Sequence, residues 1–215
     1  MIVLGAITRN DMDGRGVTRA EVLVTALALA GAAVAVGAYW RSNASAARRT
    51  NCLSNLTTIG AGLLEYTLSN GGRWPYVAKL PTMDAHQPRW PSLPQVLEPW
   101  MRGRDSAYRC PADRRTLAAG SPLVAKFGQE TTYYQTEGLS YEWMLGELYG
   151  GQAVGKDPLA RADGLGMGPA DQPVLGEFEP FHEPSPGAAS FNVLYADFHA
   201  RPMRGAARGA TGLRR

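Results

Sequence analysis

The stretch VLVTALALAGAAVAVGAY, residues 22–39, decides the fold of this chain of 215 residues. It contains no charged side chain and is rich in alanine, so we expect a helix. At about 1.5 Å per residue, such a helix is roughly 27 Å long, close to the thickness of a bilayer's hydrocarbon core. The stretch therefore predicts a membrane-spanning segment, with about one soluble domain in the remaining chain.

A carboxylate, Glu21, lies directly before this run, and Gly16 lies five residues earlier. An acid at the edge of a membrane segment is costly without a partner. Three interpretations are open. The segment could be a secretory signal peptide cut near Val36–Ala38, a plain signal anchor, or a segment cut after Gly16. Arginines lie on both sides of the run, so charge does not fix its orientation.

The order Gly16, Val17, Thr18, Arg19, Ala20, Glu21 resembles the N-terminus of type IV pilins and type II secretion pseudopilins. The resemblance implies cleavage after Gly16 by a prepilin peptidase and methylation of the new N-terminal residue, Val17. It also implies that Glu21 pairs with the amine of a neighbouring subunit. The implied partners are the peptidase, other pilin-like subunits, the assembly platform and the inner membrane. Val17 and Arg19 depart from the usual residues of this motif.

The helical pattern continues beyond residue 40. Apolar residues recur in steps of four and three, which is one face of a helix; they are Cys52, Leu56, Ile59, Leu63 and Tyr66. Asn70 and Gly71 then favour a left-handed C-cap. We therefore predict one helix from Thr18 to Leu68, half in the membrane and half amphipathic, about 76 Å long. This continuity favours cleavage after Gly16 over a removable signal peptide.

A second resemblance covers more of the chain. The segments Arg48–Leu56, Cys110-Pro111-Ala112-Asp113 and Phe191–Asp197 are similar to a large planctomycete-type class of prepilin-type proteins. Members of that class carry a histidine ten residues before the final aspartate and a glycine after it. Here those positions are Gly187 and Phe198, so no role of that histidine is transferred to this chain.

The head is expected to be α+β, a small antiparallel sheet packed on the long helix as in pilins. We predict a short helix over Leu93–Met101 and a surface loop over 150–172. The predicted strands are Thr131–Thr136, Leu139–Leu145, Pro173–Phe178 and Ser190–Ala196, with Phe198–Met203 as a hairpin partner. The expected organisation is a leader (1–16), a membrane segment (17–40), its amphipathic continuation (41–70), the head (71–203) and a disordered basic tail (204–215).

The two cysteines, Cys52 and Cys110, form either a disulfide or two buried free thiols, because an even count fits both. Neither belongs to a zinc-binding spacing. The three histidines, His86, His182 and His199, are expected on the surface or at caps.

The sequence lacks the Gly-x-Ser-x-Gly, Ser-x-x-Lys, His-Glu-x-x-His and P-loop patterns, so we expect no enzymatic activity and no cofactor. Some secretion pseudopilins bind calcium in a loop near the C-terminus. The oxygens would come from Asp157, Asp163, Asp171 and Asp197, but no EF-hand spacing supports a site. A net charge of +3 and a tail without interleaved aromatics give no reason to expect nucleic-acid binding.

These patterns predict a pseudopilin or pilin-like structural subunit. The alternative is a membrane-anchored periplasmic binding module that has a prepilin-like anchor and does not polymerise. In that case exposed aromatic side chains would form its binding surface; the candidates are Trp74, Trp90, Trp100 and Trp143.

Overall fold

A computed structural model describes residues 19–83, 89–115, 122–128, 131–145, 150–154, 168–182 and 190–204. The chain divides into two compact units, Met1–Asn43 and Ala44–Arg215. The predicted leader, with Gly16 and Val17, lies outside the described residues, and so do His86 and residues 205–215.

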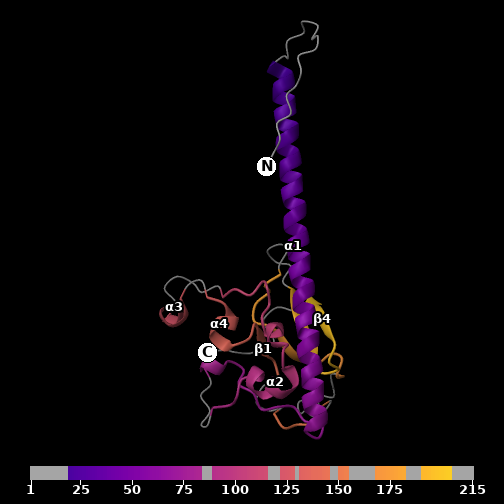
Figure 1. Ribbon diagram of the computed structural model, residues 1–215, viewed down its shortest axis with the longest axis vertical. Coiled ribbons are helices and arrows are strands. Elements are labelled where there is room, and N and C mark those ends of the chain that lie inside the picture. Colours follow the sequence, from indigo (N-terminus) through magenta and orange to yellow (C-terminus); the bar gives the residue numbers. More distant parts are fainter. Residues whose placement is uncertain are drawn as a thin grey trace, which may run out of the picture. The chain divides into compact units, whose positions relative to one another are not determined.

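The first element is the helix α1, Arg19–Ser69, 51 residues long (Figure 1). It begins and ends within one residue of the predicted limits. At its end the backbone N–H of Gly72 donates to the carbonyl of Thr67 at 2.7 Å, and Gly71 has a φ of +66°. Glycine adopts this left-handed conformation at little steric cost and often ends a helix in this way. The predicted left-handed C-cap is therefore confirmed at Gly71.

The second unit contains one sheet of four antiparallel strands in the order β1-β2-β3-β4. The strands are β1 (Tyr141–Trp143), β2 (Pro173–Glu177), β3 (Ser190–Tyr195) and β4 (Ala200–Arg204). The predicted hairpin is therefore confirmed, although β1 is shorter than the predicted strand Leu139–Leu145. A long N-terminal helix with a small antiparallel sheet is the coarse α+β arrangement expected from the sequence.

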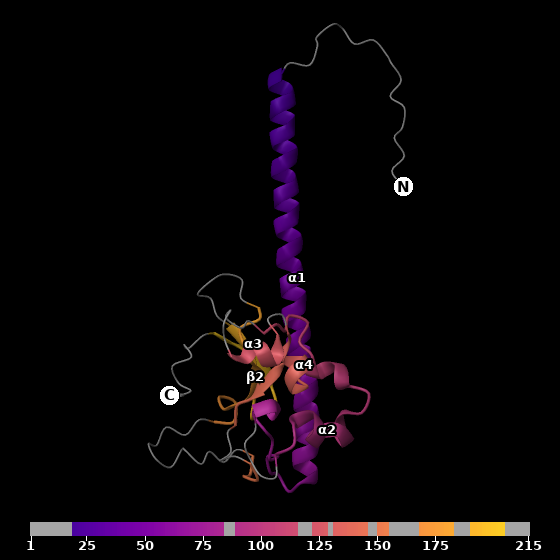
Figure 2. The same ribbon diagram turned by 90° about the vertical axis from the view of Figure 1, so that its left-hand side faces the viewer.

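The C-terminal part of α1 packs on this sheet (Figures 1 and 2). Four residues of its apolar stripe, Cys52, Leu56, Ile59 and Leu63, are each 0% exposed, and Tyr66 is partly buried against the same core. Gly60 permits the contact, because a Cβ at this position would lie 2.8 Å from Cδ1 of Leu194 on β3. The stripe therefore forms the helix side of the hydrophobic core.

The predicted helix Leu93–Met101 is confirmed as α2. The backbone N–H of Ser92 donates to Oε1 of Gln95 at 2.8 Å, which satisfies a free donor at the start of the helix. Leu93, Leu97 and Met101 are buried on one face. Met101 lies directly against Gly62 of α1, so a second glycine allows a close helix contact.

The predicted strand Thr131–Thr136 is wrong, because this segment contains the helix α4, Tyr133–Glu137. The Oγ1 of Thr132 accepts from the N–H of Gln135 at 3.1 Å, and Oε1 of Gln135 accepts from the N–H of Thr132 at 2.9 Å. Gly138 ends the helix with a φ of +80°. This reciprocal capping outweighs the β-propensity of the threonines and tyrosines. Three further short helices are η1 (Pro81–Met83), η2 (Asp105–Tyr108) and α3 (Pro122–Phe127).

The proposed surface role of two tryptophans is also wrong. Trp74 and Trp143 are 1% and 3% exposed, and their rings meet edge to face at 6.2 Å. Part of the predicted loop 150–172 covers this region. The carbonyl of Gln152 accepts from the N–H of Trp74 at 2.9 Å, and Ala153 bridges to Arg73. Trp90 and Trp100 are half-buried.

Candidate functional site

The predicted assembly residue, Glu21, lies in the first turn of α1. Its carbonyl accepts from Oγ1 of Thr25 at 2.8 Å, a bond within the helix. A carboxylate in the first turn also interacts favourably with the helix dipole. The cleavage residues Gly16 and Val17 precede the described part of the chain, which begins at Arg19, so the structure places Glu21 but not the predicted cut.

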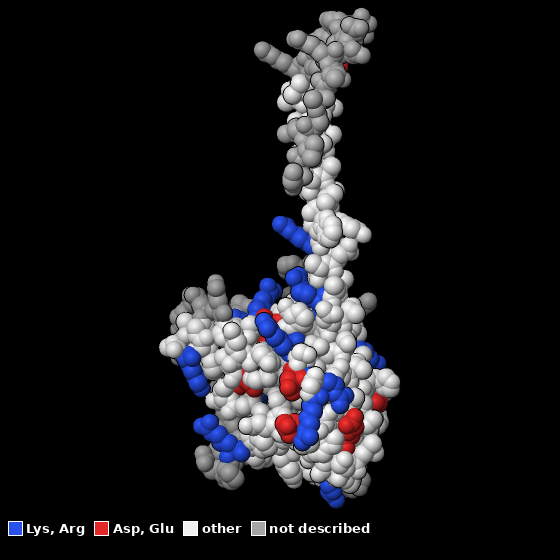
Figure 3. Space-filling view, in the orientation of Figure 1, with Lys and Arg blue, Asp and Glu red and all other residues white. Residues whose placement is uncertain are grey.

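An exposed apolar segment follows Glu21. Every residue from Ala20 to Asn43 is exposed, and the large apolar side chains are from about half to nearly three quarters accessible. Figure 3 shows mostly uncharged atoms along this part of α1. The helix contains a window of mean hydropathy 2.1, so it is long and apolar enough to cross a membrane. So large an apolar surface requires lipid or protein to cover it.

A disulfide joins Cys52 of α1 to Cys110, with the two Cα atoms 5.2 Å apart. The sequence left this pairing open against two free thiols. Cys110 begins the turn Cys110-Pro111-Ala112-Asp113, in which the N–H of Asp113 donates to the carbonyl of Cys110 at 3.0 Å. The bond therefore attaches this turn to the buried face of the long helix.

Asp113, the last residue of the same turn, holds the turn in place through hydrogen bonds to its carboxylate. Its carboxylate accepts from the N–H groups of Tyr133 and Tyr134, at 3.1 and 2.8 Å, at the start of α4. It also accepts from Oγ of Ser140 at 2.7 Å, and that oxygen accepts from the N–H of Cys110 at 2.9 Å. The aspartate thus connects the disulfide turn, the N-terminus of α4 and the segment before β1.

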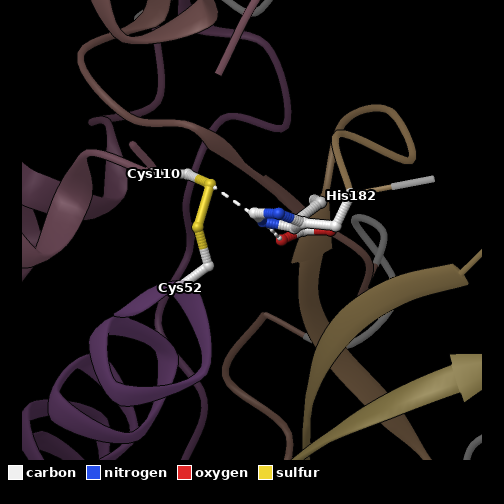
Figure 4. A group of neighbouring side chains, drawn as sticks. Cys52, Cys110 and His182 are labelled. Atoms are coloured by element: carbon white, nitrogen blue, oxygen red, sulfur yellow. Dashed lines mark hydrogen bonds and ion pairs between the residues drawn. A yellow bond between two sulfur atoms is a disulfide. The ribbon is translucent and has the colours of Figure 1, made fainter. Parts of the chain in front are cut away.

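A buried histidine lies against the disulfide (Figure 4). His182 is 4% exposed, so the prediction of a surface or capping histidine is wrong at this position. Its Nε2 lies 3.4 Å from Sγ of Cys110 and 3.2 Å from Oε1 of Glu177, the last residue of β2. One ring nitrogen therefore faces both a sulfur and a carboxylate oxygen.

Glu177 is held from its other side by β3. Its Oε2 accepts from the N–H of Asn192 at 3.1 Å, and its Oε1 accepts from Nδ2 of Asn192 at 2.7 Å. These bonds compensate a carboxylate that is only 3% exposed. The signal for this contact in the sequence is that Glu177 and Asn192 are polar residues within mostly apolar strands.

A buried ion pair between Arg115 and Glu137 supports the short helices. Arg115 donates to Oε1 of Glu137 at 3.1 Å, and its guanidinium lies over the rings of Phe127 and Tyr133. Glu137 also accepts from the N–H and the hydroxyl of Thr82. Thr82 belongs to η1, Phe127 to α3 and Tyr133 to α4. The Arg115–Glu137 pair therefore connects these three short helices of the head.

The residues considered for calcium make other contacts where they are described. Asp171 pairs with Arg201 at 3.0 Å, and Asp197 accepts from the N–H of His199 at 3.1 Å. Asp157 and Asp163 lie outside the described residues. Unlike His182, His199 has an exposed side chain.

Comparisons with protein-family models, with curated proteins and with solved structures found no match to this chain.

Proposed function

We propose that this chain is a structural, non-enzymatic subunit of a pilin-like filament, such as a type II secretion pseudopilus or a type IV pilus-like fibre. One observation carries the proposal. The helix α1 continues without a break from an exposed apolar segment into the buried stripe of the head. A removable signal peptide provides no reason for such continuity, whereas a subunit that anchors and assembles through one helix requires it.

In this proposal a prepilin peptidase cuts after Gly16 and leaves Val17 with a free amine. The segment 22–39 first holds the subunit in the inner membrane, with its head on the periplasmic side. Glu21 then pairs with the amine of a neighbouring subunit in a low-dielectric core, where the pairing fixes the register of the helices.

The composition of the segment supports close approach between subunits. Gly31 and Gly37 have no neighbouring atom within 4 Å of a Cβ built on them, among the described residues. Small residues allow helix backbones to approach closely inside lipid or a helical core. The flanking Ala30, Ala32 and Ala33 extend this narrow surface.

The alternative, an anchored binding module that does not polymerise, receives less support. It relied on an exposed aromatic surface, but Trp74 and Trp143 belong to the core. Their burial leaves the half-buried Trp90 and Trp100 as the remaining candidates.

Crosslinking in cells that contain a prepilin peptidase and the assembly platform tests the proposal. We expect multimers from the wild-type chain and their loss in Glu21→Ala, because the variant lacks the partner of the new amine. Glu65→Ala is the matched control, since Glu65 is an acid of the same helix with a half-exposed side chain in the head. Unchanged multimers in Glu21→Ala, at equal amounts of membrane-bound protein, would contradict the proposed role of the acid.

A further inference from the structure

Four potential metal ligands converge in the core of the head. The side chains of Cys52, Cys110, Glu177 and His182 are all buried, and their ligand atoms lie within 4.8 Å of one another. They come from α1, the Cys-Pro turn, the end of β2 and the segment after it. We propose that these four side chains form a tetrahedral zinc site when the disulfide is reduced. This inference is independent of the filament role.

The donor set suits the metal. Zn²⁺ binds thiolate, imidazole and carboxylate ligands in four-coordinate structural sites, at about 2.3 Å from sulfur and about 2.0–2.2 Å from nitrogen or oxygen. Tetrahedral angles at those bond lengths place neighbouring ligand atoms about 3.3–3.8 Å apart. The Cys110 Sγ–His182 Nε2 distance of 3.4 Å and the Nε2–Glu177 Oε1 distance of 3.2 Å already approximate these values.

The surroundings also suit a metal centre. Asn192 orients the Glu177 carboxylate through its backbone N–H and its Nδ2, as second-layer groups do around metal ligands. The Cys110 backbone is fixed by Ser140. Two of the ligand positions are therefore supported by hydrogen bonds that do not involve the disulfide.

The disulfide is converted to the zinc site in two steps, a reduction and the binding of the metal. A dithiol transfers two electrons and two protons to the Cys52–Cys110 bond, which breaks into two thiols while the dithiol becomes a cyclic disulfide. Zn²⁺ then displaces the two thiol protons and binds both thiolates, with neutral His182 and ionised Glu177 as the other ligands. Either crosslink, the S–S bond or the metal, connects α1 to the Cys-Pro turn.

The test compares the oxidised and reduced wild-type chain in detergent, titrated with Co²⁺ and then Zn²⁺. A trialkylphosphine is the reductant; with one water it is converted to its oxide and yields the two thiols. We expect one equivalent of Co²⁺ per reduced chain, with thiolate-to-cobalt charge-transfer bands and tetrahedral visible bands that Zn²⁺ removes. The oxidised chain should give none. If reduction unfolds the head, Zn²⁺ should restore its circular dichroism.

Variants distinguish a four-ligand site from metal binding by the two cysteine thiols alone. His182→Ala should weaken Zn²⁺ binding by more than about 100-fold, and Asn192→Ala by about 10–100-fold through the second layer. His199→Ala is the control, because that histidine is exposed, and it should bind like the wild type. Absence of tetrahedral Co²⁺ bands in the reduced wild-type chain, or unchanged affinity in His182→Ala, would overturn the proposal. Failure of filament assembly would leave it unaffected.

Discussion

Phe198 adopts a φ of +65° in the turn between β3 and β4. Its N–H donates to the carbonyl of Tyr195 at 2.8 Å, and its ring lies 5.7 Å from that of Trp74. Glycine adopts such a positive φ without strain, whereas a residue with a Cβ does not. This chain therefore combines a strained backbone with an aromatic contact to the core.

Replacing Phe198 separates these two contributions. Phe198→Gly and Phe198→Ala both lose the contact with Trp74, but only glycine relieves the left-handed backbone. We expect the free energy of unfolding of the glycine variant to exceed that of the alanine variant by about 1–2 kcal/mol. Urea unfolding of the two variants measures the difference. Equal stability, or a more stable alanine variant, would show that the turn is not left-handed.

At the scale of elements, Gly60 determines how closely α1 approaches the sheet. An added Cβ would lie 2.8 Å from Leu194 Cδ1 and 3.2 Å from the carbonyl oxygen of Phe198. We expect Gly60→Ala to lower the free energy of unfolding by about 1–3 kcal/mol, despite alanine's better helix propensity. Gly31→Ala is the control on the same helix, because its Cβ meets no described atom within 4 Å. Equal urea midpoints for the two variants would contradict this packing.

Elements with a strong local pattern were predictable from the sequence. The stripe from Cys52 to Tyr66 and the glycines after Ser69 fixed both the extent and the buried face of α1. The α4 segment lacks such a pattern: its Thr and Tyr residues favour a strand, while the cap between Thr132 and Gln135 decides for a helix.

The buried cluster could not be predicted in the same way. His182 lies 72 residues from Cys110 along the chain, and the two side chains meet through the tertiary fold of the head. No periodicity encodes such a long-range contact, and the absence of a short zinc-binding spacing pointed away from it.

At the scale of the whole head, two buried tyrosines make stability depend on alkaline pH. Burial raises the pKa of Tyr108 and of Tyr141 well above the usual value; nearby Asp105 adds to the shift for Tyr108, as Glu177 and Asp113 do for Tyr141. The unfolded chain loses these protons first, near pH 10, so it then binds fewer protons than the folded chain. Stability is therefore complete below about pH 10 and falls above it.

We expect the free energy of unfolding to fall by about 1.4 kcal/mol per pH unit for each of these tyrosines above about pH 10. Urea unfolding of the wild type and of Tyr141→Phe, from about pH 8 to pH 11, measures this slope. The variant should lose stability less steeply by the contribution of one tyrosine. If the stability of the wild type and that of Tyr141→Phe fall equally with pH, Tyr141 has the same pKa in the folded and the unfolded chain.

The proposed processing makes Val17 the first residue of the mature chain. The exposed apolar helix and its continuation into the head support retention of the segment 22–39, which a secretory signal peptidase would remove. A plain signal anchor would retain it as well, but with the leader still attached.

The most direct measurement is sequencing of the mature N-terminus by mass spectrometry, after expression with a prepilin peptidase. We expect a mature chain that begins at Val17 and carries a methylated amine, and we expect it to form only when the peptidase is present. Gly16→Ala, which changes the residue before the cut, should leave the leader attached. A mature chain that begins at Tyr39, or one that keeps its leader with the peptidase present, would contradict cleavage after Gly16.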